Sequence, residues 1–303
     1  MSASRVAPVL FRSACLVGLL SLAFLANAQT PAEAQRVNKG KTMQVTSRDG
    51  TRIAYDRRGN GPAVIVVNGA LADRSGNAEL AQLLAAHLTV YSYDRRGRGD
   101  STDSPPYSVK REIEDIEALI DAVGGSAHVY GKSSGASLAL QAASVLGEKV
   151  KKLALYEAPF SDAEGAAKEW RELKVKIDRL LAADGRADAV THFLKFVGAP
   201  DEALAQMKAS PAWPGMVAMA PTLAYDIAVV GDDRSVPVGM AAKIRAKTLV
   251  MDGSASAGPM PFMRATADKL AKVIPGARRQ VVEGQAHDVS AKALAPILLK
   301  FFD

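Results

Sequence analysis

Cysteine is almost absent from this chain of 303 residues, in which Cys15 is the only one. A single cysteine cannot form an intrachain disulfide, and it cannot supply the several thiolates of a cysteine metal site. Cys15 also lies in an N-terminal segment that we predict to be removed. We therefore expect no disulfide, no thiol catalysis and no cysteine-ligated metal in the mature protein.

The sequence also lacks an apolar run long enough to span a membrane, since a membrane-spanning helix needs roughly 18–20 apolar residues. The apolar run at residues 14–25 is shorter, follows a start with two arginines, and precedes the small-x-small pattern of residues 26–28. This pattern is typical of a secretory signal. We predict a cleaved signal peptide over residues 1–28, a loose polar tail over 29–40, and a periplasmic or secreted mature protein without a membrane partner.

Neither sign of charge dominates, since 38 Lys and Arg face 32 Asp and Glu, for a net charge of +6. The basic residues form no run and are not interleaved with aromatic residues. The pattern therefore does not predict nucleic-acid binding, and the expected partner is a small molecule. The hydrophobic content of 48% is enough for one large core with an insertion.

Short apolar runs alternate with segments of helical periodicity. The run Ala-Val-Ile-Val-Val at residues 63–67 is typical of a strand buried on both faces. A hairpin precedes it, around Asp49-Gly50. The alternation predicts an α/β fold with a doubly wound, mostly parallel sheet. Further strands are expected at residues 89–93, 127–130, 152–156, 248–251 and 280–282.

The alternation stops at Pro159 and resumes at Thr248. The segment between them shows helical spacing, glycines and prolines, but no clear strand. We predict a helical cap over residues 159–245. The α/β core is then formed by residues 41–158 and 246–303.

Ser133 is the candidate nucleophile, because Gly131-Lys132-Ser133-Ser134-Gly135 follows a predicted buried strand and precedes a predicted helix. A sharp strand-to-helix turn lifts a serine hydroxyl above the sheet edge and requires small residues two positions away on each side. The glycines meet this requirement around Ser133. Centring the turn on Ser134 would put a lysine at a crowded position.

His287 is the candidate base among only four histidines. It lies in the loop between the last predicted strand and the last helix, and this loop returns to the edge of the sheet that carries Ser133. The other three lie at a helix end, inside a strand and in the cap: His87, His128 and His192. The last of these could also face a pocket.

The chain resembles the α/β-hydrolase superfamily over nearly its whole predicted mature length. Besides the serine and histidine motifs, residues 93–101 (Tyr-Asp-Arg-Arg-Gly-Arg-Gly-Asp-Ser) resemble a structural loop that follows the fourth strand in that family. The resemblance implies an eight-stranded sheet, with the cap in the position of residues 159–245. It also implies the chain order serine, acid, histidine for a catalytic triad.

The acid of the triad departs from the family pattern. The family usually supplies it as Gly-x-x-Asp after the seventh strand, where this chain has Gly253-Ser254-Ala255-Ser256. Two other carboxylates end predicted strands, Glu157 on the sixth and Asp252 on the seventh. We favour Glu157, which resembles the displaced acid of some haloalkane dehalogenases, and keep Asp252 as the alternative.

The resemblance also implies an oxyanion hole of two backbone N–H groups. One belongs to the residue after the nucleophile, Ser134. The other follows the third strand, where Asn68-Gly69 replaces the family's His-Gly pair; we assign it to Ala70, with Leu71 as the alternative. Lys132, beside the nucleophile, could face either the pocket or solvent.

These residues predict an exported serine hydrolase, a carboxylesterase or lactonase acting on a small to medium acyl substrate through an acyl-enzyme. Such chemistry needs no metal or organic cofactor. Hydrolysis of amide or carbon–carbon bonds would use the same residues. The competing class is a non-catalytic ligand-binding homologue, motivated by Ser256 and Asn68.

Overall fold

The computed structural model describes residues 42–258 and 260–303. The predicted signal peptide (1–28) and tail (29–40) lie outside these residues. Within them, no helix has the length and apolar character needed to cross a membrane.

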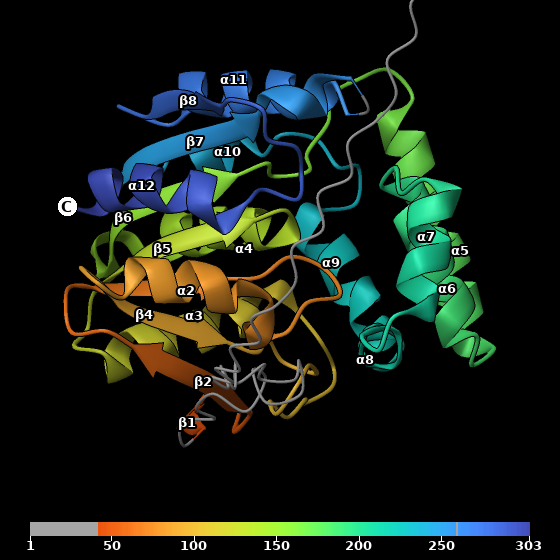
Figure 1. Ribbon diagram of the computed structural model, residues 1–303, viewed down its shortest axis with the longest axis horizontal. Helices are drawn as coiled ribbons and strands as arrows, with labels where there is room; N and C mark the ends of the chain where they lie inside the picture. Colours follow the sequence, from red (N-terminus) through yellow and green to blue (C-terminus); the bar gives the residue numbers. More distant parts are fainter. Residues whose placement is uncertain (1–41, 259) are drawn as a thin grey trace, which may run out of the picture. The chain divides into compact units, whose positions relative to one another are not determined.

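The described chain is built on one sheet of eight strands in the order β1-β2-β4-β3-β5-β6-β7-β8 (Figure 1). Strands β1 and β2 pair antiparallel, as do β2 and β4, and all other neighbours are parallel. The predicted mostly parallel eight-stranded sheet is therefore confirmed. The strands are β1 (Met43–Thr46), β2 (Arg52–Arg58), β3 (Ala63–Val67), β4 (Thr89–Tyr93), β5 (Ala127–Lys132), β6 (Val150–Tyr156), β7 (Lys247–Gly253) and β8 (Arg278–Val282).

Both faces of the sheet are buried along β3, whose successive side chains point to opposite sides. In β3, Val64 and Val66 belong to one apolar cluster, whereas Ile65 and Val67 belong to the other. Each of these side chains contributes about 1.5–3 kcal/mol on full burial. This explains the unbroken β-branched run in the sequence.

Helices cover the two faces as separate layers (Figure 1). The first layer, α2 (Ala78–Leu84) and α12 (Ala291–Phe302), packs on the cluster that contains Val64. The opposite layer packs on the cluster that contains Ile65 and consists of α3 (Val109–Ala122), α4 (Ser134–Leu146) and α11 (Phe262–Val273).

Between β6 and β7, the described chain forms helices and no strand. In Figure 1 most of these helices stand beyond the carboxyl ends of the parallel strands, and α9 returns toward the sheet. The segment consists of α5 (Ala166–Ala182), α6 (Arg186–Phe196), α7 (Asp201–Ala209), α8 (Trp213–Ala218), α9 (Leu223–Val230) and α10 (Val238–Ala241). We refer to residues 159–245 as the cap.

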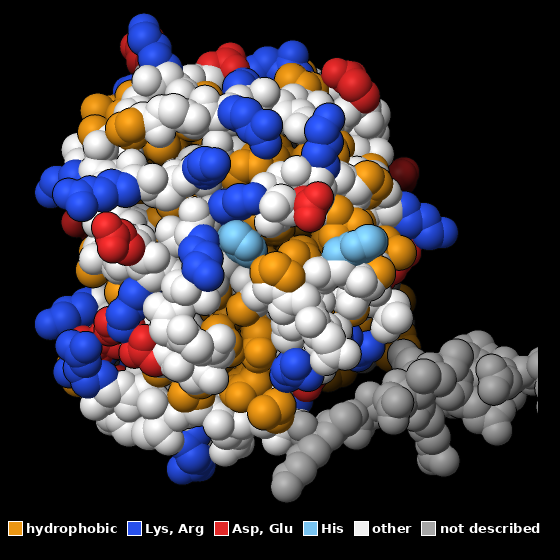
Figure 2. All heavy atoms as spheres, turned by 90° about the vertical axis from the view of Figure 1, so that its left-hand side faces the viewer, with side chains coloured by type: hydrophobic (Ala, Val, Ile, Leu, Met, Phe, Trp, Pro, Cys, Tyr) orange, Lys and Arg blue, Asp and Glu red, His pale blue; other side chains and the backbone are white. Residues whose placement is uncertain are grey.

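The opposite end of the sheet carries the amino ends of the parallel strands. Figure 2 shows this face, where Lys and Arg side chains are spread among neutral and apolar atoms. The candidate site lies at the other end, where β3 is hydrogen-bonded to both β4 and β5. The chain leaves β3 toward β4 on one side and β5 lies on the other, so a crevice opens at their carboxyl ends.

Candidate active site

Ser133 lies in a strained turn between β5 and α4. Its backbone has φ 57° and ψ −131°, in the left-handed half of conformational space that side chains other than glycine rarely adopt. A Cβ added to Gly131 would collide with the backbone of Gly135, and one added to Gly135 would collide with Val67. The strand and helix therefore approach as closely as the glycine spacing predicts.

His287 and Glu157 are brought together from chain positions 130 residues apart. The imidazole Nδ1 lies 2.7 Å from Oε2 of Glu157. The histidine loop is itself held in place, because the hydroxyl of Tyr156 donates a 2.6 Å hydrogen bond to the carbonyl of Ala286. The histidine therefore has a carboxylate partner on one ring nitrogen, and its side chain lines the same cavity as Ser133.

Glu157 is 2% exposed and directly follows β6. Its second oxygen accepts a 2.9 Å hydrogen bond from the N–H of Gly253. Burial opposes ionisation, but His287, the neighbouring hydroxyl of Ser256 and this N–H outweigh it and hold the pKa of Glu157 below its ordinary value. The carboxylate is therefore ionised at neutral pH.

Asp252, the alternative acid, has different partners. Its buried carboxylate pairs with Arg264 of α11 at 3.1 Å and also with Arg279 of β8. These contacts tie β7 to its neighbouring strand and helix. Asp252 thus has its charge balanced by two arginines, whereas Glu157 is the carboxylate that contacts the histidine.

The two candidate oxyanion donors line the cavity beside Ser133. Ser134 is the first residue of α4, so its N–H is one of the first-turn donors that have no partner within the helix. Ala70 follows β3, in the loop that faces Ser133. Leu71, the alternative, has φ 54° and is buried in the apolar cluster.

The loop after β3 is braced by side chains that sequence reasoning did not assign. Nδ2 of Asn68 donates to the carbonyl of Asp73 at 2.7 Å, and its Oδ1 accepts from Asn77. Nη1 of Arg98 donates to the carbonyl of Gly69 at 2.6 Å. In a trans peptide the C=O and N–H point in opposite directions, so this bond also orients the N–H of Ala70.

A buried network joins the cap to the turn between β5 and α4 through Asp226 of α9. Its carboxylate accepts from the hydroxyl of Ser134 at 2.7 Å and pairs with Arg95 at 2.6 Å and Arg98 at 2.7 Å. Burial opposes the charge, but Arg98, Arg95 and Ser134 outweigh it and hold the pKa of Asp226 below its ordinary value. Arg95 also pairs with buried Glu112.

Lys132 does not belong to the cavity lining. Its ammonium pairs at 3.1 Å with Asp288, the exposed residue that follows His287. The pair links the turn that contains Ser133 to the loop that contains His287 at the surface. An exposed pair of this kind contributes at most about 1 kcal/mol to stability.

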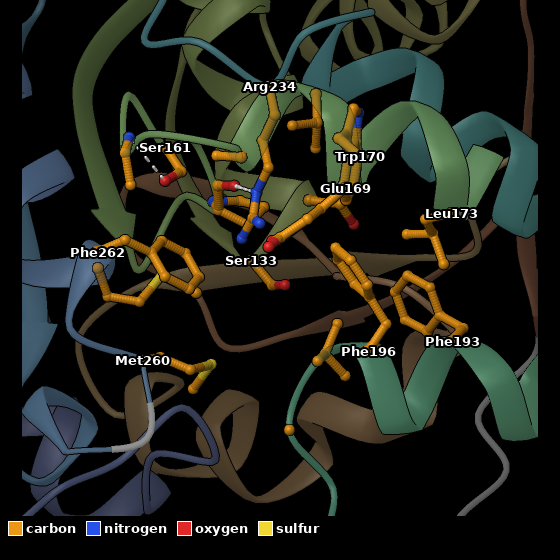
Figure 3. Close-up of a pocket in the computed structure, with 18 of the residues that line it drawn as sticks. Ser133, Ser161, Glu169, Trp170, Leu173, Phe193, Phe196, Arg234, Met260 and Phe262 are labelled. Atoms are coloured by element: carbon orange, nitrogen blue, oxygen red, sulfur yellow. Dashed lines mark hydrogen bonds between the residues drawn. The ribbon is translucent and has the colours of Figure 1, made fainter.

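Ser133 opens into a cavity of about 870 Å³ between the core and the cap. Figure 3 shows aromatic side chains surrounding it, including Trp170, Phe193, Phe196 and Phe262. His192 also lines the cavity. Tyr225 does not belong to the cavity lining; its ring stacks on Tyr107 and its hydroxyl donates to Asp103. In the part of the chain that the structure describes, no group of His, Cys, Asp or Glu side chains could hold a metal ion.

Comparisons with known proteins agree with this arrangement. Residues 64–295 match the model of the alpha/beta hydrolase family. The chain belongs to this family. An alpha/beta hydrolase of known structure from Sphaerobacter thermophilus is 49% identical, with a TM-score of 0.79, and the match covers 86% of this chain and 100% of that one.

Two further proteins are similar to this chain at lower identity or over a shorter stretch. A hydrolase from Pseudomonas aeruginosa is 26% identical over 87% of this chain and 99% of that one, with a TM-score of 0.68. The uncharacterized hydrolase YraK of Bacillus subtilis is 35% identical over 108 residues, which are 34% of this chain and 38% of YraK. The chain thus matches less than half the length of that relative.

Sequence reasoning about this alpha/beta hydrolase missed Asp226. Arg95 and Arg98 stand in the loop that follows β4, and arginines in a buried loop require carboxylate partners. That requirement indicates from the sequence that a buried carboxylate partner exists. It could not identify the partner, because Asp226 lies 131 residues from Arg95 in the chain.

Proposed function

We propose that this hydrolase cleaves a carboxylic ester or lactone through an acyl-enzyme, with Ser133 as nucleophile, His287 as base and Glu157 as the acid. The observation that carries the proposal is the 2.7 Å contact between His287 and the buried carboxylate of Glu157, in a cavity that also holds Ser133 on its strained turn.

Glu157 has two roles in this mechanism. Its carboxylate accepts the Nδ1–H of His287, which selects the tautomer whose Nε2 is free to accept a proton. Its negative charge then stabilises the imidazolium that forms. The depressed pKa of Glu157 keeps this charge in place at neutral pH.

The reaction proceeds in two halves. His287 takes the proton of the Ser133 hydroxyl while the oxygen attacks the carbonyl carbon, and the backbone N–H groups of Ala70 and Ser134 stabilise the oxyanion. The tetrahedral intermediate then expels the alcohol, which takes the proton from His287. Water attacks the acyl-enzyme in the same way and releases the acid and Ser133.

An ester is favoured over an amide on chemical grounds. An alcohol leaves a tetrahedral intermediate with less need for protonation than an amine does. Solved structures that share the fold include an esterase from Exiguobacterium antarcticum and an enol-lactonase from Burkholderia xenovorans, at 20% and 23% identity. At that identity they support the fold and not the substrate.

The proposal is tested by fluorophosphonate labelling and by hydrolysis of a chain-length panel of nitrophenyl esters. The mature protein is expected to be labelled at Ser133 and to hydrolyse short to medium esters. Ser133→Ala should abolish both, whereas Ser144→Ala, in helix α4 that follows Ser133 and hydrogen-bonded to the carbonyl of Gln141, should retain both. A folded wild type without adduct or turnover would favour a ligand-binding protein.

We also propose that the enzyme acts outside the cytoplasm, on the sequence pattern of residues 1–28 alone. N-terminal sequencing of the protein recovered from the periplasm of an expressing bacterium is expected to start at Gln29. A mature chain that begins at Met1 would contradict this proposal.

A further inference from the structure

Arg234 is a buried arginine in the wall of the cavity that contains Ser133. It lies between α9 and α10, where the cap returns to the core, and it is only 7% exposed. Figure 3 shows its side chain extending from the cavity wall toward Ser133, with the ring of Phe262 on one side and that of Phe196 on the other.

The guanidinium is held by one hydrogen bond and three aromatic rings. Its Nε donates to the carbonyl of Pro159 at 2.6 Å. Its central carbon lies 4.3 Å from the ring centre of Phe262, 5.3 Å from that of Trp170 and 5.7 Å from that of Phe196. Such cation–π contacts hold the group in place while leaving its planar edge available for hydrogen bonding.

The backbone of Arg234 is also constrained. Its φ is 60°, and its carbonyl accepts a 2.7 Å hydrogen bond from the N–H of Ser161. A left-handed conformation at a residue other than glycine costs about 1–3 kcal/mol and persists only where surrounding contacts enforce it. The structure thus maintains a strained backbone that directs a cation into the cavity.

No ion pair neutralises this cation within residues 42–258 and 260–303. No carboxylate oxygen there lies within 4.0 Å of its guanidinium nitrogens, and its two terminal nitrogens have no hydrogen-bond acceptor. Three other buried arginines differ, because Arg95, Arg96 and Arg98 each pair with a carboxylate at 2.9 Å or less. Arg234 therefore has unused donors beside the aromatic side chains of the cavity wall.

The other charged side chains of the cavity form no ion pair with Arg234. Asp226 is already paired with Arg95 and Arg98. The remaining charged side chains of the lining are exposed, namely Glu164, Glu169, Glu172 and Lys176. Burial lowers the pKa of Arg234 to about 10, against the opposing effect of Glu169, so the group stays charged at neutral pH.

We propose that Arg234 binds a carboxylate of the substrate, so that the enzyme prefers esters or lactones carrying a second, ionised carboxyl group. This inference rests on the proposed function, in which the substrate is a hydrolysable ester. The planar fork of a guanidinium matches the two oxygens of a carboxylate. A single unpaired cation suits a monoanion better than a doubly charged phosphate. The apolar cavity then accommodates the chain between the carboxylate and the ester carbonyl at Ser133.

The test compares monomethyl esters of dicarboxylic acids, from succinate to suberate, with neutral counterparts in which the free carboxylate is an amide. Release of methanol is followed by NMR. For the best chain length, wild-type kcat/KM is expected to be at least about tenfold higher for the anionic ester, the range of a charge-assisted hydrogen bond. Equal or lower values for the anionic esters at every length would overturn the proposal.

Variants then assign the preference to Arg234. Arg234→Met should reduce the anionic-to-neutral ratio of kcat/KM about tenfold or more through KM, whereas Arg234→Lys should retain part of it. Lys176→Met removes an exposed positive charge from the same cavity and should leave the ratio within about threefold, because exposed charges are screened. A ratio that falls equally in Lys176→Met and Arg234→Met would contradict a specific contact.

Binding without turnover separates this proposal from the proposed function. In a Ser133→Ala background, calorimetric titration should show monomethyl adipate binding more tightly than methyl adipamate, and the difference should disappear with Arg234→Met. If wild type is not labelled by fluorophosphonate while this difference persists, the proposed hydrolysis fails and carboxylate recognition stands. If labelling succeeds and the difference is absent, the carboxylate site is wrong.

Discussion

Arg98 donates a 2.6 Å hydrogen bond to the carbonyl of Gly69, whose peptide carries the N–H of Ala70. The same guanidinium pairs with Asp226 at 2.7 Å and donates to Thr222 at 3.1 Å. One buried arginine therefore connects the cap to the peptide that we propose as an oxyanion donor. The planar guanidinium of Arg98 thus links the position of the cap to the orientation of the Ala70 N–H.

Arg98→Lys should lower kcat more than it raises KM. A lysine keeps a charge near Asp226 but cannot also hold the Gly69 carbonyl in the same plane, so the Ala70 N–H loses its orientation. We expect kcat to fall about tenfold to a hundredfold, less than complete loss of one oxyanion donor. Steady-state kinetics on a nitrophenyl ester measure this. An unchanged kcat with reduced stability would show that other contacts hold the peptide.

Asp226→Asn should destabilise the fold by about 3–5 kcal/mol, because it leaves Arg95 and Arg98 short of a buried counter-charge. Urea unfolding followed by tryptophan fluorescence measures the free energy. The control is Asp178→Asn, which breaks the exposed pair with Lys174 and should cost at most about 0.5 kcal/mol. Similar losses in the two variants would contradict a structural role for the Asp226 network.

The destabilisation by Asp226→Asn should depend on pH. Because the folded-state pKa of Asp226 is depressed, its charge contributes fully above the unfolded pKa of about 3.9, and this contribution is lost as the pH falls through the lower folded value. The difference in unfolding free energy between wild type and variant should be equal at pH 7 and 5 and smaller at pH 3. Other acids titrate in both proteins and cancel. A difference that grows at pH 3 would refute this assignment.

Glu157→Gln and Asp252→Asn should separate catalysis from stability. Loss of the Glu157 charge and of the tautomer it selects should reduce kcat by about 10³–10⁴-fold. Asp252→Asn should mainly lower the free energy of unfolding, because it removes the partner of Arg264 and Arg279. Steady-state kinetics and urea unfolding of both variants measure the change in kcat and the change in the free energy of unfolding. A larger kcat loss in Asp252→Asn would exchange the two assignments.

Gly135→Ala should destabilise the protein by about 1–3 kcal/mol and disturb the nucleophile, since the added methyl collides with the backbone of Val67 and Asn68. Gly215→Ala is the matched control, because its Cβ would meet nothing within 4 Å inside α8. That change should be neutral or stabilising by up to about 1 kcal/mol. Thermal unfolding and fluorophosphonate labelling of both variants test this contrast.

Local pattern in the sequence was enough to predict the sheet and the glycine-flanked turn at Ser133. The β-branched run at residues 63–67 predicts a strand with two buried faces, and β3 divides its side chains between two apolar clusters. The spacing of Gly131 and Gly135 around Ser133 is a steric requirement of one short segment. Such features depend on neighbours in the chain, so they can be read without the fold.

Tertiary structure decided what depends on distant segments. The sequence offered Glu157 as the favoured acid and Asp252 as the alternative, and only the fold brings the residue after β6 to His287 in the loop after β8, while arginines surround Asp252. Asp226 and Arg234 carried no local motif. Their roles depend on which distant residues the fold places next to a buried charge, and the chain around each residue does not specify this.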